Sequence, residues 1–571
     1  MKTKIFNIAA LGLLTIGMAA CSDSFLDVSS KTETTTGNYY KTETDAAHAL
    51  TGCYDGWQCT VSFGPTFSFQ YASELMADDC FGGTGANDAR NSQVIDRFDI
   101  NQDPSQVNLH NSLWTYYYQA LYRVNELLTH ENEIAWTSDE TKSRYMGEAR
   151  AIRAILYFDL VRLFENVPLL TVPTTENVAQ AAPAEVYAQI VEDLKYAAEN
   201  IPANAYPKSD AASNDGRITR YAAKALLARV YLFYYGVYGG EPAGLTKAEA
   251  LQGLEDVISS GEYSLIPVYK NLWPAASTTW TQDASGNWTE NSTYAGNGNA
   301  ETVLSMKFNY TSDYNGNSGG NNTIQMISLR GGTFKAPYGQ GWGGGTVSKK
   351  TVASYGSGDQ RRTASIIDLA SEGIADMAEY QKALADQREY TGFFNKKYTA
   401  RSKWFQADDG SWSLTHYYND VMAGDFMISQ PQDYVLIRYA DVLLMAAELG
   451  ASNAQGYFDQ VRRRAYTEVD ADGNTSLSGY YTAKTASKAN ILDERHLEFA
   501  FEGVRYWDLL RQGVDVAAAA IAASGEPVLT GGNDDQVTIT ADNITAKRGF
   551  QQIPLTQIQL SNNLLKQNAG W

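Results

Sequence analysis

Apolar side chains recur at helical spacing over most of the chain. From Tyr145 to Leu163 they step by three or four residues, which is the period of one helix face, and Pro168 follows the run as a stop signal. The pattern therefore predicts a mainly α protein. Helices with the same spacing are expected at 183–202, 218–236, 436–450 and 453–465.

Small residues along these helices predict close packing. Ala222 and Ala225 would let a neighbouring helix approach, and Gly236 is expected to end the helix that carries them. Such Ala-rich helix pairs look like tetratricopeptide units, although their spacing is irregular. An isolated pair cannot bury its apolar face, whereas stacked pairs can. We therefore expect tetratricopeptide-like helix pairs in an α-α superhelix.

The pattern changes in the middle of the chain. Residues 271–345 are rich in Gly, Asn and Trp and poor in charge, and 399–425 form a second insert of this kind. Disordered segments are poor in aromatic residues, so ordered loops are the better interpretation. Apolar and polar residues alternate, loosely, only over 301–310, which indicates a short strand there. We expect a leader at 1–20 and one domain at 21–571, made of a tether (21–44), a helical scaffold (about 45–270 and 426–571) and an irregular, loop-rich lobe with little β (about 271–425).

One C-terminal stretch, ILDERHLEFAFEGVRYWDLLRQG at 491–513, has the composition of an active site. Its apolar residues would lie on two sides of a single helix, which predicts burial between neighbours, with the charges paired along the helix. A catalytic interpretation would need two carboxylates that face a cleft. The buried, ion-paired helix is the favoured interpretation. The charged residues that fall on one arc are Glu494, Arg495, Glu498, Glu502, Arg505 and Asp508.

The N-terminus has the pattern of a bacterial lipoprotein leader. Lys2 and Lys4 precede an apolar run that is too short for a membrane span, and Ala19 and Ala20 stand directly before Cys21. This arrangement resembles a lipobox, which implies cleavage after residue 20 and lipidation of Cys21. An ordinary signal peptide is the alternative.

Composition and motifs exclude several classes of function. The chain has 65 acidic and 45 basic side chains, a net charge of −20, which argues against a nucleic-acid partner. Cys53 and Cys59 have the spacing of a small disulfide loop, but no cysteine spacing matches a zinc site, and we expect no metal or cofactor. The stretches GNSGG and GQGWGG lack the strand and helix that a nucleophile elbow or a dinucleotide-binding loop needs.

The aromatic side chains of the two inserts are the remaining chemical signal. Indole and phenol rings stack on the flat C–H faces of sugars, and polar side chains bond to the hydroxyl groups. Rings among Gly, Asn, Ser and Thr suit such a platform, although burial of each ring under its own loop is the alternative. The candidate glycan contacts are Trp280, Trp288, Tyr294, Tyr338 and Trp342, with Trp404 and Trp412 as second-tier candidates.

Several stretches, in order, resemble the SusD/RagB family of outer-membrane nutrient-binding lipoproteins. The resemblance covers nearly the whole mature chain. It implies tetratricopeptide-like helix pairs, an outward-facing lipid anchor at the outer membrane, and a complex with a TonB-dependent (SusC-like) transporter. The stretches are the lipobox with SDSFLDV, EARAIRAILYFDLVRLFENVPL, ITRYAAKALLARVYLF, YGSGDQRRTASI, LIRYADVLLMAAEL, DERHLEFAFEGVRYWDLLR and IPLTQIQLSNNLLKQNAGW.

The resemblance also implies capture of glycans without catalysis. Ligand contacts in the family come from a loop after the first helix and from the irregular lobe. That loop corresponds loosely to ELMADDCFGGTGANDARN, which offers Asp79, Asn87 and Arg90 as contacts, together with Asp78. The same polar residues would also suit helix caps or a metal ion.

We therefore expect a lipid-anchored, surface-exposed protein that captures an oligosaccharide or polysaccharide by ring stacking and delivers it to the transporter. Two other functions stay open at this point. One is a glycoside hydrolase that uses paired carboxylates, and the other is a tetratricopeptide-like module that binds peptides or proteins.

Overall fold

The computed structural model describes the chain in seven stretches. The leader and Cys21 lie outside them, so the predicted lipidation site is not among the described residues. The described residues are 39–62, 67–210, 216–311, 319–331, 335–418, 428–470 and 472–571.

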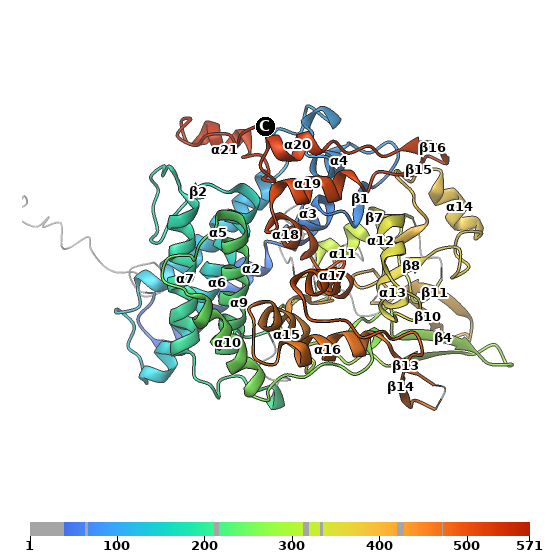
Figure 1. Cartoon of the computed structure of the whole chain (residues 1–571), viewed down its shortest axis with the longest axis horizontal. Helices are drawn as coiled ribbons and strands as arrows, with labels where there is room; N and C mark the ends of the chain where they lie inside the picture. The colour runs from blue at the N-terminus through green and yellow to red at the C-terminus, as the bar shows by residue number, and fades with distance from the viewer. Residues whose placement is uncertain are drawn as a thin grey trace, which may run out of the picture.

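Helices dominate the chain, as the apolar spacing predicts. Figure 1 shows α2, α5, α6, α7, α9 and α10 gathered on one side, with most of the strands on the other. None of the described helices is long and apolar enough to cross a bilayer. The helices are α2 (Glu43–Gln58), α3 (Phe69–Met76), α4 (Asn91–Asp96), α5 (Asn111–Thr129), α6 (Asp139–Phe164), α7 (Pro183–Asn200), α9 (Arg220–Tyr238), α10 (Lys247–Ser259), α11 (Asn322–Ile327), α12 (Lys349–Ser354), α13 (Arg361–Ser365), α14 (Ala378–Leu384), α15 (Tyr439–Glu448), α16 (Ala454–Ala465), α17 (Lys488–Phe499), α18 (Arg505–Leu510), α19 (Val514–Ala522), α20 (Ala541–Ala546) and α21 (Leu555–Leu560).

Within the described residues the strands form antiparallel pairs and no larger sheet. The predicted strand within 301–310 is confirmed as β6, which pairs with β12. The hairpins β4–β5 and β10–β11 replace parts of the two expected loops. The pairs are β1 (Cys80–Gly83) with β7 (Gly344–Val347), β2 (Val167–Pro168) with β3 (Gln180–Ala181), β4 (Thr278–Gln282) with β5 (Trp288–Ser292), β6 (Thr302–Met306) with β12 (Tyr434–Arg438), β8 (Ile366–Asp368) with β9 (Phe393–Asn395), β10 (Ser402–Gln406) with β11 (Trp412–His416), β13 (Thr467–Val469) with β14 (Thr475–Leu477), and β15 (Pro527–Thr530) with β16 (Asn533–Gln536).

The scaffold helices pack in pairs, as the tetratricopeptide-like prediction requires. α2 packs on α5, α6 on α7, α7 on α9, α9 on α10, and α15 on α16. Nearly every side chain of α6 from Met146 onward is buried, so this helix forms the centre of the scaffold. A Cβ on Gly147 would lie 2.6 Å from Ile201, which shows how closely α6 and the end of α7 approach.

One local prediction was wrong. Gly236 does not end α9, which runs to Tyr238; a Cβ there would lie 2.2 Å from the backbone oxygen of Arg511, so the glycine allows close packing. The structure also answers a question that the cysteine spacing left open: no disulfide joins Cys53, which is buried within α2, to Cys59, which caps the C-terminus of that helix.

Residues 491–513 form two helices instead of one. α17 ends at Phe499 and α18 begins at Arg505, and Phe501 and Gly503 between them adopt left-handed φ angles of 68° and 74°. The predicted burial is confirmed. The predicted pairing along the stretch holds only in part: Arg505 pairs with Asp78 on a distant segment, whereas Asp508 pairs within the stretch with Arg495 and Arg511.

A buried network of ion pairs joins α17 to β12, α13 and α16. The Glu498 carboxylate lies 2.9 Å from the Arg438 guanidinium, 2.5 Å from that of Arg464 and 3.3 Å from that of Arg361. All four side chains are at most 3% exposed. Burial by itself would raise the pKa of Glu498, but the guanidinium groups of Arg464, Arg438 and Arg361 lower it to about 2.

Other carboxylates extend this network. Glu301 accepts from Arg464 at 2.9 Å, Glu494 from Arg361 at 2.7 Å, and Glu502 from Lys397 at 2.7 Å. These carboxylates are buried and ion-paired, and the cavity beside Glu502 has a volume of only about 40 Å³. The catalytic interpretation of 491–513 therefore finds no support in the geometry.

Breaking this network should strongly destabilise the fold. We expect Glu498→Gln to lower the free energy of unfolding by about 3–5 kcal/mol, because three buried guanidinium groups lose a partner. The folded-state pKa of about 2 lies below the ordinary value of 4.5, so the contribution is present above pH 4.5 and is lost as the pH falls toward 2. Urea unfolding of both proteins at pH 7 and pH 3 measures the two effects.

Glu133→Gln is the matched control, because Glu133 pairs with Lys41 at an exposed position where an ion pair contributes little. An unfolding midpoint for Glu498→Gln equal to that of the control would show that the network does not support the fold.

Candidate functional site

The antiparallel pair β1–β7 carries the two loops of the candidate site. Its register places Cys80 opposite Val347 and Gly83 opposite Gly344. The chain leaves β1 at Thr84 and reaches α4 by a short loop, while Trp342 lies just before β7. A loop near the N-terminus and a loop of the lobe therefore meet at one end of the pair.

A hollow opens between these two loops. Its volume is about 330 Å³, which is within the range of small-molecule sites. Trp342 is 36% exposed, so one part of its indole ring is available to a ligand. The residues around the hollow include Thr84, Asp88, Asn91, Met326, Arg330 and Trp342.

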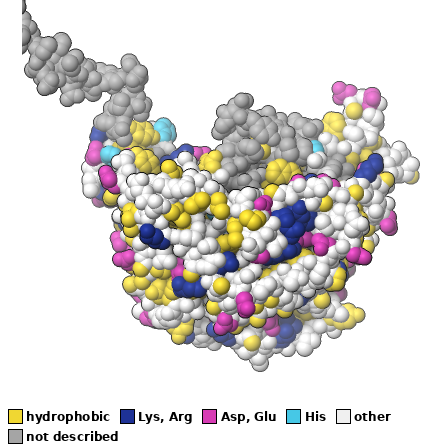
Figure 2. Space-filling view, turned by 90° about the horizontal axis from the view of Figure 1, so that it is seen from above, with side chains coloured by type: hydrophobic (Ala, Val, Ile, Leu, Met, Phe, Trp, Pro, Cys, Tyr) yellow, Lys and Arg dark blue, Asp and Glu magenta, His cyan; other side chains and the backbone are white. Residues whose placement is uncertain are grey.

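The charges beside the hollow are balanced. The Arg330 guanidinium lies 2.5 Å from the Asp386 carboxylate and 3.5 Å from that of Asp88, and both carboxylates are about half exposed. Figure 2 shows the side of the molecule on which α4 lies, where Lys and Arg side chains gather beside Asp and Glu. Because Arg330 is already paired, the hollow suits an uncharged ligand with hydroxyl groups better than an anion.

Trp342 is the one predicted contact that lines the hollow. Asn87 is exposed on the same loop, next to the lining residue Asp88. Arg90 is half-buried and donates to Gln102 Oε1 at 2.9 Å, so its side chain is held by the segment after α4. Sequence reasoning missed Asp88, Asn91 and Arg330, because no spacing links these positions to Trp342.

Two of the predicted glycan contacts, Tyr338 and Asp79, are buried. The prediction that their side chains contact a ligand was wrong. Tyr338 is 4% exposed, packs in an apolar cluster with Ile367 and Phe394, and donates its hydroxyl to Glu372 at 2.5 Å. Asp79 is fully buried, so no ligand can reach its carboxylate from the hollow. The tertiary structure buries both side chains, and no local feature of the sequence indicates this burial.

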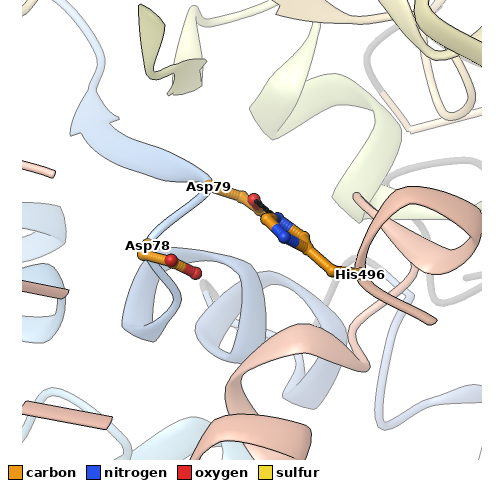
Figure 3. Close-up of side chains that lie close together, drawn as sticks. All are labelled: Asp78, Asp79 and His496. Carbon is orange, nitrogen blue, oxygen red and sulfur yellow. Dashed lines mark hydrogen bonds and ion pairs between the residues drawn. The ribbon is translucent and has the colours of Figure 1, made fainter. Parts of the chain in front are cut away.

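Asp79 belongs to a cluster with Asp78 and His496 (Figure 3). Its Oδ1 accepts from Thr351 Oγ1 at 2.8 Å and lies 2.6 Å from His496 Nε2 on α17. Asp78 is held by Arg505 at 2.7 and 3.0 Å and by Lys350 at 3.3 Å. Because Arg505 and Lys350 already pair with Asp78, and Asp79 is held by hydrogen bonds, the geometry favours a polar anchor at the start of β1 over a metal site.

The remaining predicted rings lie on and beside the hairpins of the lobe. Trp288 on β5 and Trp404 on β10 stack on each other, with ring centroids 4.4 Å apart and planes 6° from parallel. One face of each ring is therefore covered by the other. Trp280 and Trp412 are half-buried on β4 and β11, and Tyr294 donates its hydroxyl to Asn297 at 2.6 Å.

Comparisons with known proteins match the whole fold. Residues 279–571 match the model of the SusD family, and residues 24–232 match a model described as starch-binding associating with outer membrane. A SusD-like protein of Formosa agariphila is 25% identical over 90% of each chain. A SusD-like protein of Bacteroides ovatus is 25% identical over 54% of this chain and 50% of its own.

Solved structures share this architecture. A laminarin binding SusD-like protein has a TM-score of 0.66 and 26% identity, covering 93% of this chain and 100% of its own. Surface glycan-binding protein A from Bacteroides thetaiotaomicron in complex with laminarihexaose has a TM-score of 0.69 and 22% identity, covering 92% of this chain and 100% of its own. These names describe binding proteins and not enzymes. The match of the SusD model to half of the chain, with these relatives, shows that the protein belongs to the SusD family.

Proposed function

We propose that the protein is a lipid-anchored, surface-exposed glycan-binding protein that captures an oligosaccharide or polysaccharide beside Trp342 and delivers it to a TonB-dependent transporter. The observation that carries the proposal is an exposed indole ring in a hollow whose other walls offer polar groups. A sugar would stack on the ring and bond through its hydroxyls to Asp88, Asn91 and the backbone. Cys21, behind its lipobox, would supply the anchor.

The expected ligand is a neutral glycan. Asp88 and Asp386 already pair with Arg330, so a uronate or sulfate would meet two carboxylates and no unpaired guanidinium. The laminarin binding SusD-like protein and the laminarihexaose complex among the structural neighbours make laminarin the first glycan to test. A small, wet site of this kind should bind weakly.

A longer glycan would extend onto neighbouring surfaces. The half-exposed ring edges of Trp288, Trp404 and Trp412 lie on the same lobe as Trp342, and their hairpins pack together. We propose these surfaces as secondary contacts, together with the exposed loop beside the hollow. The residues are Trp280, Trp288, Tyr294, Trp404, Trp412, Asn87 and Arg90.

A groove on the scaffold is our candidate for the transporter contact. It lies between α5, the loop after β2 and α21, with a volume of about 490 Å³. Apolar side chains that line it are exposed: Leu560 by 66%, Tyr122 by 51% and Val178 by 36%. Exposed apolar patches mark protein contacts. In Figure 1, α21 and the site helix α4 lie along the same edge of the molecule, which suits transfer of a ligand to a partner on that side.

Removing the exposed ring should weaken glycan binding. We expect Trp342→Ala to reduce the affinity for laminarin about tenfold, because a lost ring contact of roughly 1.4 kcal/mol corresponds to that factor. Affinity electrophoresis and isothermal titration calorimetry measure the change. Tyr480→Ala is the control, since Tyr480 is 67% exposed but lies outside the hollow, and it should bind as the wild type does.

Trp288→Ala and Trp404→Ala locate the secondary contacts. Weaker retention of long laminarin, with unchanged affinity for a short oligosaccharide, supports them. Normal binding by Trp342→Ala combined with lost binding by these two variants would move the site to the hairpins.

Placing a charge on the groove should separate the protein from its transporter. We expect Leu560→Glu in the full-length lipoprotein to lose most of the transporter that co-purifies from outer membranes, because a carboxylate would be desolvated in the contact. Laminarin binding should not change. Leu477→Glu, at a position 40% exposed on β14, is the control. Undiminished co-purification of Leu560→Glu would exclude this groove.

A further inference from the structure

The segment Asp386–Glu389, between α14 and β9, contacts both loops of the hollow. The backbone oxygen of Asp386 accepts a hydrogen bond from the Ala86 N–H at 2.6 Å. The Arg388 N–H donates to Thr84 O at 2.9 Å. Both hydrogen bonds join the segment to the loop that follows β1. Asp386 also holds Arg330, which lines the hollow. A short stretch far away in sequence therefore follows the loop that leaves β1.

Arg388 grips this loop through its carbonyl oxygens. One guanidinium nitrogen, Nη2, donates to Ala86 O and to Asp88 O, both at 2.8 Å. The other, Nη1, donates to Ala89 O at 3.4 Å and to Gln93 Oε1 at 3.3 Å. The planar guanidinium thus holds three backbone carbonyl groups of the loop that carries Asp88.

This arginine is an unusual use of a buried charge. Arg388 is 5% exposed, and its guanidinium forms no salt bridge with any described residue, although most buried guanidinium groups of this protein do. Burial lowers the pKa of Arg388, with a further contribution from the nearby Arg90. The Glu389 and Asp88 carboxylates oppose this shift from nearby without forming a salt bridge, and the guanidinium donates its hydrogen bonds to neutral acceptors of the loop and of α4.

The neighbours of Arg388 join the two loops to each other. The side-chain nitrogen Nε2 of Gln387 donates to Thr84 O at 3.2 Å and to Gly343 O at 3.1 Å. Gly343 directly follows Trp342 in the chain. The Glu389 carboxylate accepts from the Gly83 N–H at 2.9 Å. The Gln387 side chain therefore reinforces the direct hydrogen bond of 2.8 Å from the Thr84 N–H to Gly343 O, which joins the end of β1 to the loop that carries the exposed indole.

Backbone strain marks the same contacts. Thr84 and Glu389 adopt left-handed φ angles of 75° and 50°, which are costly for residues with a Cβ. Such conformations persist only where the surroundings hold them, and they concentrate at ligand-binding sites. Both strained residues lie where Asp386–Glu389 meets the loops of the hollow.

We propose that Asp386–Glu389 is a clamp that positions the two ligand-binding loops, with Arg388 and Gln387 as its positioning residues. The clamp holds Asp88, Asn91 and Trp342 in their binding geometry before the ligand arrives, so that binding does not have to order the loops. This inference rests on the proposed function, because the hollow is its ligand site. Neither positioning residue needs to touch the ligand.

Hydrogen exchange of the full mature protein tests the clamp without any ligand. Arg388→Ala should raise the exchange rate of the amides in residues 84–91 at least tenfold and leave the scaffold helices unchanged. Methylguanidinium at tens of millimolar, compared with sodium chloride at equal ionic strength, should restore protection by filling the vacated space. Arg362→Ala is the matched control, because Arg362 is exposed and pairs only at the surface with Asp368.

Laminarin titration of the same proteins tests the consequence. We expect Arg388→Ala to bind about tenfold more weakly, Arg388→Lys to recover part of the affinity, and methylguanidinium to rescue the alanine variant. Gln387→Leu, which keeps the volume but loses the donor, serves as a second variant if Arg388→Ala does not fold. Rescue by methylguanidinium would show that Arg388→Ala lost the positioning of the loops and not the structure of the protein as a whole.

The outcomes distinguish the two proposals. Unchanged exchange in residues 84–91 overturns the clamp whatever the ligand. Faster exchange with unchanged laminarin affinity overturns its role in binding and leaves the proposed function intact. A wild-type protein that binds no neutral glycan overturns the proposed function, and the exchange data then decide the clamp alone.

Discussion

The ion pairs between Glu498 and three arginines are the interaction on which the rest of the structure depends. They connect α17 to β12, α13 and α16, and so join the helical scaffold to the lobe. Apolar packing alone tolerates small shifts of one layer over another, whereas buried charges do not, because each must keep its partner. The network therefore fixes the register between scaffold and lobe.

Buried ion pairs also hold the strand that leads to the candidate site. Asp78 with Arg505 and Asp79 with His496 anchor the start of β1 to α18 and α17. From there the strand pair β1–β7 leads directly to the loops of the hollow. The ion pairs hold one end of this strand pair, and Asp386–Glu389 holds the other. The loops therefore have little freedom to move. Preorganisation of this kind suits a site too small to gain much affinity from buried area.

The chemistry of the site is that of recognition. Its carboxylates beside the hollow pair with Arg330, and the many acidic groups of the C-terminal helices are buried in ion pairs. This agrees with the solved relatives of the chain, whose names describe binding proteins.

The sequence by itself determined the scaffold, because apolar side chains that repeat every three or four residues have only one way to be buried. It also marked β6, whose residues are all buried, but not the hairpins β4–β5 and β10–β11, whose exposed faces leave no alternating signal. Trp342 and Tyr338 stand in the same Gly-rich stretch, yet only the tertiary structure decided that one is exposed and the other buried. It alone placed Arg388 against Ala86 and Asp88, since hydrogen bonds between residues some three hundred positions apart leave no periodic trace in a chain.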